Sequence, residues 1–187
     1  YQNVEEMLEV EDAGVLISAR LRLADGFLEI GESERAREHA MSVHDLSLEL
    51  NEHQLHARSR VILGRYYAKT KDSELSLLHY NAALETFSEE ANPTNAVETE
   101  MLLGQVLVDV GRTSEASEHY LDALSIAEAN DFRLLQAEIL ARLGTIRGDR
   151  SERVAYLQRS LSVFKDLGAH TRMKEIQNSV HRALMGR

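Results

Sequence analysis

The sequence contains no cysteine and no tryptophan, and only one of its 187 residues is a proline. The lack of cysteine excludes a disulfide framework, a thiolate nucleophile and zinc or iron–sulfur sites with cysteine ligands, and it fits a reducing compartment. Proline is far below its usual share of about 5%. This scarcity permits long helices and argues against a turn-rich β-sandwich or barrel.

Long apolar runs are also lacking, since none approaches the roughly 18 residues that span a bilayer. We therefore predict a cytoplasmic chain without a membrane partner. Because the chain begins with Tyr1 rather than methionine, we interpret it as part of a longer protein.

Negative charge predominates, with 31 acidic against 21 basic residues and a net charge of −10. Such a balance disfavours binding to nucleic acid. The charge is unevenly distributed, because residues 142–187 hold ten Lys or Arg against four Asp or Glu. Apolar residues at helical spacing between these basic ones indicate the solvated faces of packed helices. We therefore do not expect nucleic acid as a partner of this basic stretch.

A spacing of 40 residues organises nearly the whole chain. A hydrophobic residue followed by a small one recurs at Leu23-Ala24, Leu63-Gly64, Leu103-Gly104 and Leu143-Gly144. Three positions beyond the small residues stand Phe27, Tyr67, Leu107 and, breaking the pattern, Arg147. A second series runs through Ala36, Ser76 and Ala116, followed four residues later by Ala40, Tyr80 and Tyr120. The fourth copy is three residues shorter between its two halves.

These patterns predict pairs of helices. Apolar residues in each first half recur at helical spacing, and the small residue lets the second helix of the pair approach closely. Glycines such as Gly31 and Gly111 suit the left-handed residue after a helix, and Ser or Thr two residues later suits the next N-cap. We place Pro93 in the link before the third pair, because proline breaks helices.

The expected organisation is a single array over residues 1–187. Residues 1–9, with Val4, Met7 and Leu8, end a truncated upstream repeat. Four repeats follow at 13–50, 53–90, 95–129 and 132–167. Within them we expect first helices over 13–30, 53–70, 95–110 and 132–147, and second helices over 33–50, 73–90, 113–129 and 151–167. A closing helix spans 170–185.

The repeated residues resemble the tetratricopeptide repeat, whose pattern is Leu-Gly, an aromatic, Gly, Ala, an aromatic and a second Ala. The copy that fits best contains Leu103, Gly104, Leu107, Gly111, Ala116, Tyr120 and Ala123. The family's usual period is 34, so a period of 40 is similar to the longer repeats of bacterial signalling proteins. The resemblance implies an all-α fold in which antiparallel helix pairs stack into a right-handed superhelix.

The resemblance also implies a concave groove lined by the first helices, which binds a peptide or protein segment. At the positions that the family exposes there, this chain has Arg22, Asp25, Arg58, Ile62, Arg65, Lys69, Met101, Leu102, Gln105 and Arg142. Apolar anchors beside the basic residues Arg58, Arg65 and Lys69 suit an acidic and hydrophobic peptide. The Lys and Asn with which related domains clamp chaperone carboxylates are absent from this register, so a cochaperone role is disfavoured.

Eight histidines raise the question of a metal site. His39, His79 and His119 occupy one repeat position, and stacked repeats would hold them roughly 10 Å apart, too far to share an ion at about 2 Å per bond. His53 and His56 are three residues apart but lack an evident third ligand. We predict no metal and no cofactor.

No phosphate loop, nucleophile elbow or zinc-protease helix occurs, and no carboxylates pair in an apolar pocket. We therefore predict a non-catalytic interaction or sensory module of a larger signalling protein, such as a diguanylate cyclase, kinase or transcription regulator, that binds a peptide or protein segment. The alternative is a homo-oligomerisation scaffold that positions an output domain. An enzymatic role, such as a phosphatase, would need a catalytic pair that the sequence does not reveal.

Overall fold

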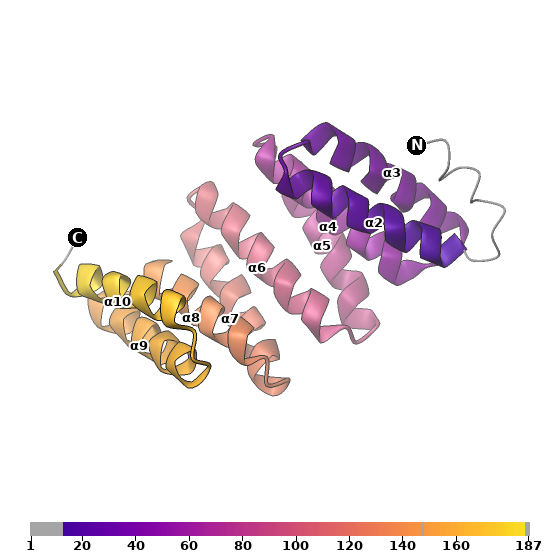
Figure 1. Cartoon of the computed structure of the whole chain (residues 1–187). Helices are drawn as coiled ribbons and strands as arrows, with labels where there is room; N and C mark the ends of the chain where they lie inside the picture. Colours follow the sequence, from indigo (N-terminus) through magenta and orange to yellow (C-terminus); the bar gives the residue numbers. More distant parts are fainter. Residues whose placement is uncertain (1–12, 147, 186–187) are drawn as a thin grey trace. The chain divides into compact units, whose positions relative to one another are not determined.

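The structure, a computed structural model, describes residues 13–146 and 148–185 (Figure 1). These residues form nine α-helices and no strand: α2 (Ala13–Glu29), α3 (Ser33–Glu49), α4 (His53–Lys69), α5 (Ser73–Glu89), α6 (Pro93–Asp109), α7 (Thr113–Ala129), α8 (Arg133–Ile146), α9 (Arg150–Asp166) and α10 (His170–Met185). The predicted all-α fold is confirmed, and each helix end lies within two residues of its predicted position. The predictions for residues 1–9 and for Arg147 fall outside the described residues.

The chain divides into two compact units, residues 1–90 and 91–187. In the first unit α2, α3, α4 and α5 pack in chain order, and α2 also meets α4. In the second unit the helices α6 to α10 pack in chain order, and α6 also meets α8. Each unit is thus built from helix pairs in which the first helix of one pair packs against both helices of the pair before it, as expected for helical-hairpin repeats. The single array over the whole chain stays a prediction.

The small residue of each repeat lies where two helices of a pair approach closely. A Cβ added to Gly64 would stand 2.5 Å from the Tyr80 ring, and one added to Gly104 would stand 2.5 Å from the Tyr120 ring. At Gly144 an added Cβ would lie 2.6 Å from Cγ of Leu157. All three distances are far below van der Waals contact, so glycine is required at these positions and the predicted reason for it is confirmed.

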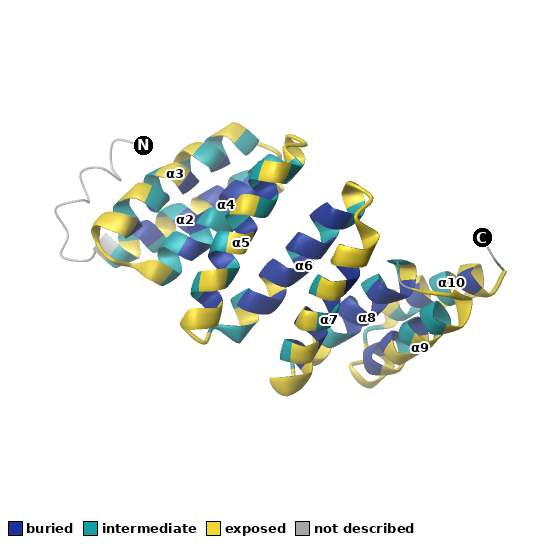
Figure 2. Cartoon of the chain, turned by 180° about the vertical axis from the view of Figure 1, so that it is seen from behind, coloured by how far each residue is buried: buried dark blue, intermediate teal, exposed yellow. Residues whose placement is uncertain are grey.

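The first repeat fills the same space differently. Ala24 replaces the glycine and Ala40 replaces the aromatic partner, and both side chains are fully buried in one cluster with Leu21 and Val43. A small residue on each helix therefore takes the place of a glycine and a ring. Figure 2 shows that such buried residues run in stripes along the helices, while the turns are exposed.

The turns between helices contain a left-handed residue, as predicted. Its φ is +87° at Gly31 and +81° at Gly111, but the second repeat has Lys71 with a φ of +64°. The expected N-caps are shifted by one residue: Ser33 and Ser73 are already helical, and Asp72 is the cap whose side chain accepts a hydrogen bond from the Leu75 amide. Aspartate caps in the same way as serine.

Pro93 is not in the link but is the first residue of α6, where Asn92 is the N-cap and accepts from the Asn95 amide at 3.2 Å. Proline is tolerated there because the first amides of a helix have no partner within it. The third pair therefore begins two residues earlier than expected.

Candidate functional site

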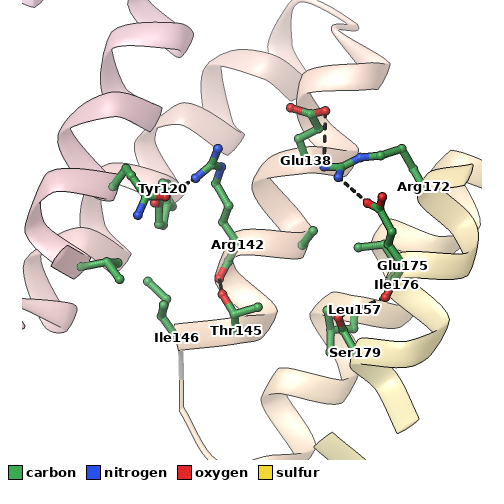
Figure 3. Close-up of a pocket in the computed structure, with 13 residues that line it drawn as sticks. Tyr120, Glu138, Arg142, Thr145, Ile146, Leu157, Arg172, Glu175, Ile176 and Ser179 are labelled. Atoms are coloured by element: carbon green, nitrogen blue, oxygen red, sulfur yellow. Dashed lines mark hydrogen bonds and ion pairs between the residues drawn. The ribbon is translucent and has the colours of Figure 1, made fainter. Parts of the chain in front are cut away.

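The second unit contains a cavity of about 330 Å³ on the side formed by α6, α8 and α10 (Figure 3). Its lining residues are Gln105, Val108, Tyr120, Glu138, Ala141, Arg142, Thr145, Ile146, Leu157, Arg172, Glu175, Ile176 and Ser179. Most of them belong to the first helices of the hairpins, and α10 extends that series. The volume lies at the lower end of the range for small-ligand sites.

One wall of the cavity is built around Arg142. Its Nη1 donates a hydrogen bond to Oε1 of Gln105 at 2.6 Å, and Nε2 of Gln105 donates to Oδ1 of Asp109 at 2.9 Å. The guanidinium carbon lies 5.9 Å from the ring centroid of Tyr120, whose pKa is raised because the phenol is buried. This wall therefore presents a cation whose direct hydrogen-bond acceptor is a neutral amide.

The other wall is an ion-pair cluster. Arg172 pairs with Glu138 at 3.5 Å and with Glu175 at 2.6 Å, and its guanidinium carbon lies 5.6 Å from the centroid of Phe164. Figure 3 shows the two carboxylates on either side of the Arg172 head group. Two carboxylates and one guanidinium leave this wall with a net negative charge.

Apolar side chains complete the lining. Leu157 and Ile176 are buried, as is most of Ala141, whereas Val108 and Ile146 are half-buried. The cavity thus combines an apolar surface with a positive wall and a negative wall. Such a surface can hold an apolar side chain and fix the orientation of a charged neighbour.

The predicted groove residues of the second unit lie in different environments. Gln105 and Arg142 line the cavity. Leu102 is half-buried outside it, and Met101, only 8% exposed, belongs to a core cluster with Tyr120. The prediction that Met101 is an exposed anchor is wrong, because its side chain is packed between helices.

Sequence reasoning missed the contribution of α10. A signal was present: Glu175 follows Glu138 by 37 residues, the same interval that separates the starts of α8 and α10 at Arg133 and His170. Glu175 is therefore the repeat equivalent of Glu138, displaced by the shortening of the fourth repeat.

In the first unit the predicted groove residues make internal contacts. Nη1 of Arg65 donates to Oδ1 of Asp25 at 2.7 Å, and Nζ of Lys69 donates to the carbonyl of Leu28, so both cations tie α4 to α2. Ile62 is 3% exposed in the core, and the prediction of an exposed anchor there is wrong as well.

Two further predicted residues, Arg22 and Arg58, are exposed and half-buried, respectively. Within residues 13–146 and 148–185 neither forms an ion pair. The binding roles assigned to the groove residues of both units stay predictions.

The three repeated histidines pack against the first helices. His39 stacks on Phe27 and His79 on Tyr67, with ring centroids 5.3 Å apart in both pairs. In the third repeat Leu107 offers no ring, and Nδ1 of His119 lies 2.6 Å from Oε2 of Glu100 instead. That hydrogen bond raises the pKa of His119, whereas burial lowers the pKa of His39 and His79.

The His56 ring packs against the His44 ring, with the two ring centroids 4.4 Å apart. Burial lowers its pKa to about 4, and the neighbouring His44 and Arg60 add to the effect. No group of three or more His, Cys, Asp or Glu in the described part of the chain is arranged to hold a metal ion. None of the helices described is both long and apolar enough to cross a membrane.

In the comparison with known families, residues 101–130 match the family model of the tetratricopeptide repeat. No curated protein matches the chain. Among solved structures, the chain is similar to aspartyl phosphate phosphatase F from Bacillus subtilis, with 14% identity, a TM-score of 0.83, and coverage of 98% of this chain and 49% of that protein.

Two other solved structures are also similar to the chain. A signal transduction ATPase with numerous domains and a tetratricopeptide repeat sensor, from Pyrococcus horikoshii, has 14% identity and a TM-score of 0.81, with 96% of this chain and 28% of that one covered. The Rap conjugation gene regulator of plasmid pLS20, in complex with the Phr* peptide, has 14% identity and a TM-score of 0.64, with 86% and 51% covered. At these identities the likeness shows the fold alone, and this chain spans half or less of the phosphatase and of the ATPase.

Proposed function

We propose that the chain, whose residues 101–130 match the tetratricopeptide repeat model, is a non-catalytic interaction or sensory module of a larger cytoplasmic signalling protein. It binds a peptide or protein segment on the face formed by α6, α8 and α10. The observation that carries the proposal is the cavity between these helices, lined by Gln105 and Arg142 from the register expected for ligand contact.

The comparisons support an interaction or sensory role. One similar structure is a gene regulator in complex with a peptide, and another carries a tetratricopeptide repeat sensor. A third is named a phosphatase, so the non-catalytic character of this chain remains part of the proposal. Stacked helical hairpins present long ligand-binding surfaces. Ligand binding fits this chain, because residues of α6, α8 and α10 line one cavity.

The proposal is tested by selecting binders to the whole chain from a displayed library of random peptides. The variant Thr145→Trp places an indole at the exposed Thr145, on the cavity lining. It should weaken binding of the selected peptides by about tenfold or more, since it removes space for a ligand side chain. The control Ser162→Trp adds the same ring to an exposed position of α9 outside the cavity and should bind normally. A library that yields no binder, or binders indifferent to Thr145→Trp, refutes the proposal.

Homo-oligomerisation is the second candidate, because α2 exposes an apolar face. Leu23 is 45% exposed, whereas its repeat equivalents Leu63, Leu103 and Leu143 are at most 4% exposed. Val15 on the same helix and Ile30 directly after it are also exposed, and exposed apolar patches mark interaction surfaces. Light scattering over a range of concentrations tests this candidate: a constant monomer mass rules it out, and a dimer that Leu23→Glu dissociates supports it.

A further inference from the structure

The arginines on the first helices differ in how their charge is neutralised. Arg65 has the carboxylate of Asp25 at 2.7 Å, and Arg172 has the carboxylates of Glu138 and Glu175. Arg142 instead donates to the amide oxygen of Gln105. Among the residues that the structure describes, no carboxylate lies within ion-pair distance of Arg142, and the nearest acidic group in its hydrogen-bond chain, Asp109, is reached only through Gln105.

The surroundings of Arg142 favour an anion at its guanidinium. The side chain is half-buried beside the Tyr120 ring, where a charge is less well solvated than in open water. Charge-assisted hydrogen bonds to a carboxylate are about twice as strong as bonds to a neutral amide, and guanidinium binds carboxylates through two parallel bonds. A ligand carboxylate would therefore replace the Gln105 amide oxygen with a gain in free energy.

The ion-pair cluster of Arg172, Glu138 and Glu175 fixes the direction of such a ligand. Glu138 and Glu175 carry one more negative charge than Arg172 neutralises, so an acidic group is repelled there and attracted at Arg142. The apolar residues Val108, Ile146, Leu157 and Ile176 complete the lining and would contact an aliphatic neighbour of the acidic residue.

Resting on the proposed function, we propose that the bound segment is an acidic peptide in which an Asp or Glu side chain pairs with Arg142 and an adjacent aliphatic side chain fills the apolar part of the cavity. Within this cavity the charge preference belongs to Arg142. Of the three basic residues that the sequence suggested as the acidic-peptide site, Arg58, Arg65 and Lys69, the last two are held by Asp25 and by the Leu28 carbonyl in the other unit.

Peptides selected on the whole chain test the inference through their sequences. They should be enriched in Asp or Glu next to Leu, Ile or Val. In a synthetic copy of the tightest binder, replacing the acidic residue by its amide should weaken binding about tenfold to a hundredfold, as measured by titration calorimetry.

Two variants of the chain address the cation itself. Arg142→Gln removes it, and Gln105→Glu keeps it but supplies an internal carboxylate at the position of its present acceptor. Both should abolish the difference between the acidic peptide and its amide. Arg159→Gln, which breaks the exposed pair with Glu128 outside the cavity, should leave that difference intact. Circular dichroism melting of all three establishes that they are folded.

The outcomes separate the two proposals. If Thr145→Trp weakens binding of the selected peptides but the acidic peptide binds no better than its amide, the inference is overturned and the proposed function stands. An acid preference that survives in both Arg142→Gln and Gln105→Glu also overturns it. A library without cavity-dependent binders refutes the proposed function and the inference together.

Discussion

Arg65 and Asp25 each follow the small residue of their repeat by one position, and they meet across 40 residues of sequence with Nη1 2.7 Å from Oδ1. The contact joins α4 to α2 at positions where the resemblance predicts ligand contacts. In the first unit these groove residues therefore hold neighbouring repeats together. In the second unit the residue at the same position, Gln105, contacts Arg142, which pairs with no carboxylate among residues 13–146 and 148–185.

The strength of the Asp25–Arg65 contact can be measured with a double-mutant cycle of Asp25→Asn and Arg65→Gln. The side chains are 41% and 33% exposed, so solvent screens the pair, and we expect a coupling free energy of about 0.5–1 kcal/mol in urea unfolding. The exposed pair between Arg112, the N-cap residue of α7, and Glu115 in its first turn serves as a comparison and should give a smaller value. A coupling of zero would show that the contact does not tie the repeats.

Gly104→Ala should destabilise the fold by about 1–3 kcal/mol, because its Cβ would overlap the Tyr120 ring and force the two helices apart. Gly26→Ala is the matched control: nothing lies within 4 Å of the added Cβ, and alanine in a helix gains about 0.5–1 kcal/mol over glycine. Thermal unfolding should move in opposite directions for the two variants. Equal shifts would contradict the close-approach explanation.

Lys71→Gly should stabilise the chain by about 0.5–1 kcal/mol. Lys71 holds a φ of +64° in the turn where other repeats have Gly31 and Gly111, and a left-handed residue other than glycine is strained by roughly 1–2 kcal/mol, partly offset by the larger entropy of glycine in the unfolded chain. Urea unfolding measures the gain. Gly111→Ala should lose stability for the same reason, and a loss in Lys71→Gly would contradict the argument.

His119 should titrate above the ordinary histidine value of about 6.5, since the hydrogen bond that its ring donates to Glu100 raises its pKa. Its stabilising contribution is fully present below pH 6.5 and is lost as the pH rises through the folded-state value. Imidazole proton shifts in NMR spectra report the titration directly. Glu100→Gln should lower the His119 value, and an unchanged midpoint would show that the contact does not form in solution.

His56 provides the opposite case in the same spectra. Its pKa is lowered to about 4, so the unfolded chain binds the proton more tightly than the folded one. The stability associated with neutral, buried His56 is therefore fully present above pH 6.5 and is lost as the pH falls toward 4.

The helix pairs could be predicted from the sequence because one period governs both the spacing of Gly64 and Gly104 and the aromatic residues that cover them. The site was harder to predict. Register led to Gln105 and Arg142, which line the cavity, although their binding role stays a prediction. It could not tell that Ile62 and Met101 turn into the core, because exposure depends on the size of neighbouring side chains and not on spacing. Nor could it show that Asp25 would neutralise Arg65, since a pairing across repeats depends on side-chain rotamers.

The small residue on the first helix of a pair and its partner on the second helix are matched in size, and this match limits how the repeats can be recombined. The tyrosine of α5 fits only against Gly64, and Ala24 of α2 already fills part of that space in the first pair. A chimera that joined α2 to α5 would overpack, and one that joined α4 to α3 would leave a void where a ring belongs. The unit of exchange in this chain is thus a complete hairpin, and viable crossover points lie in the turns that precede α4, α6 and α8.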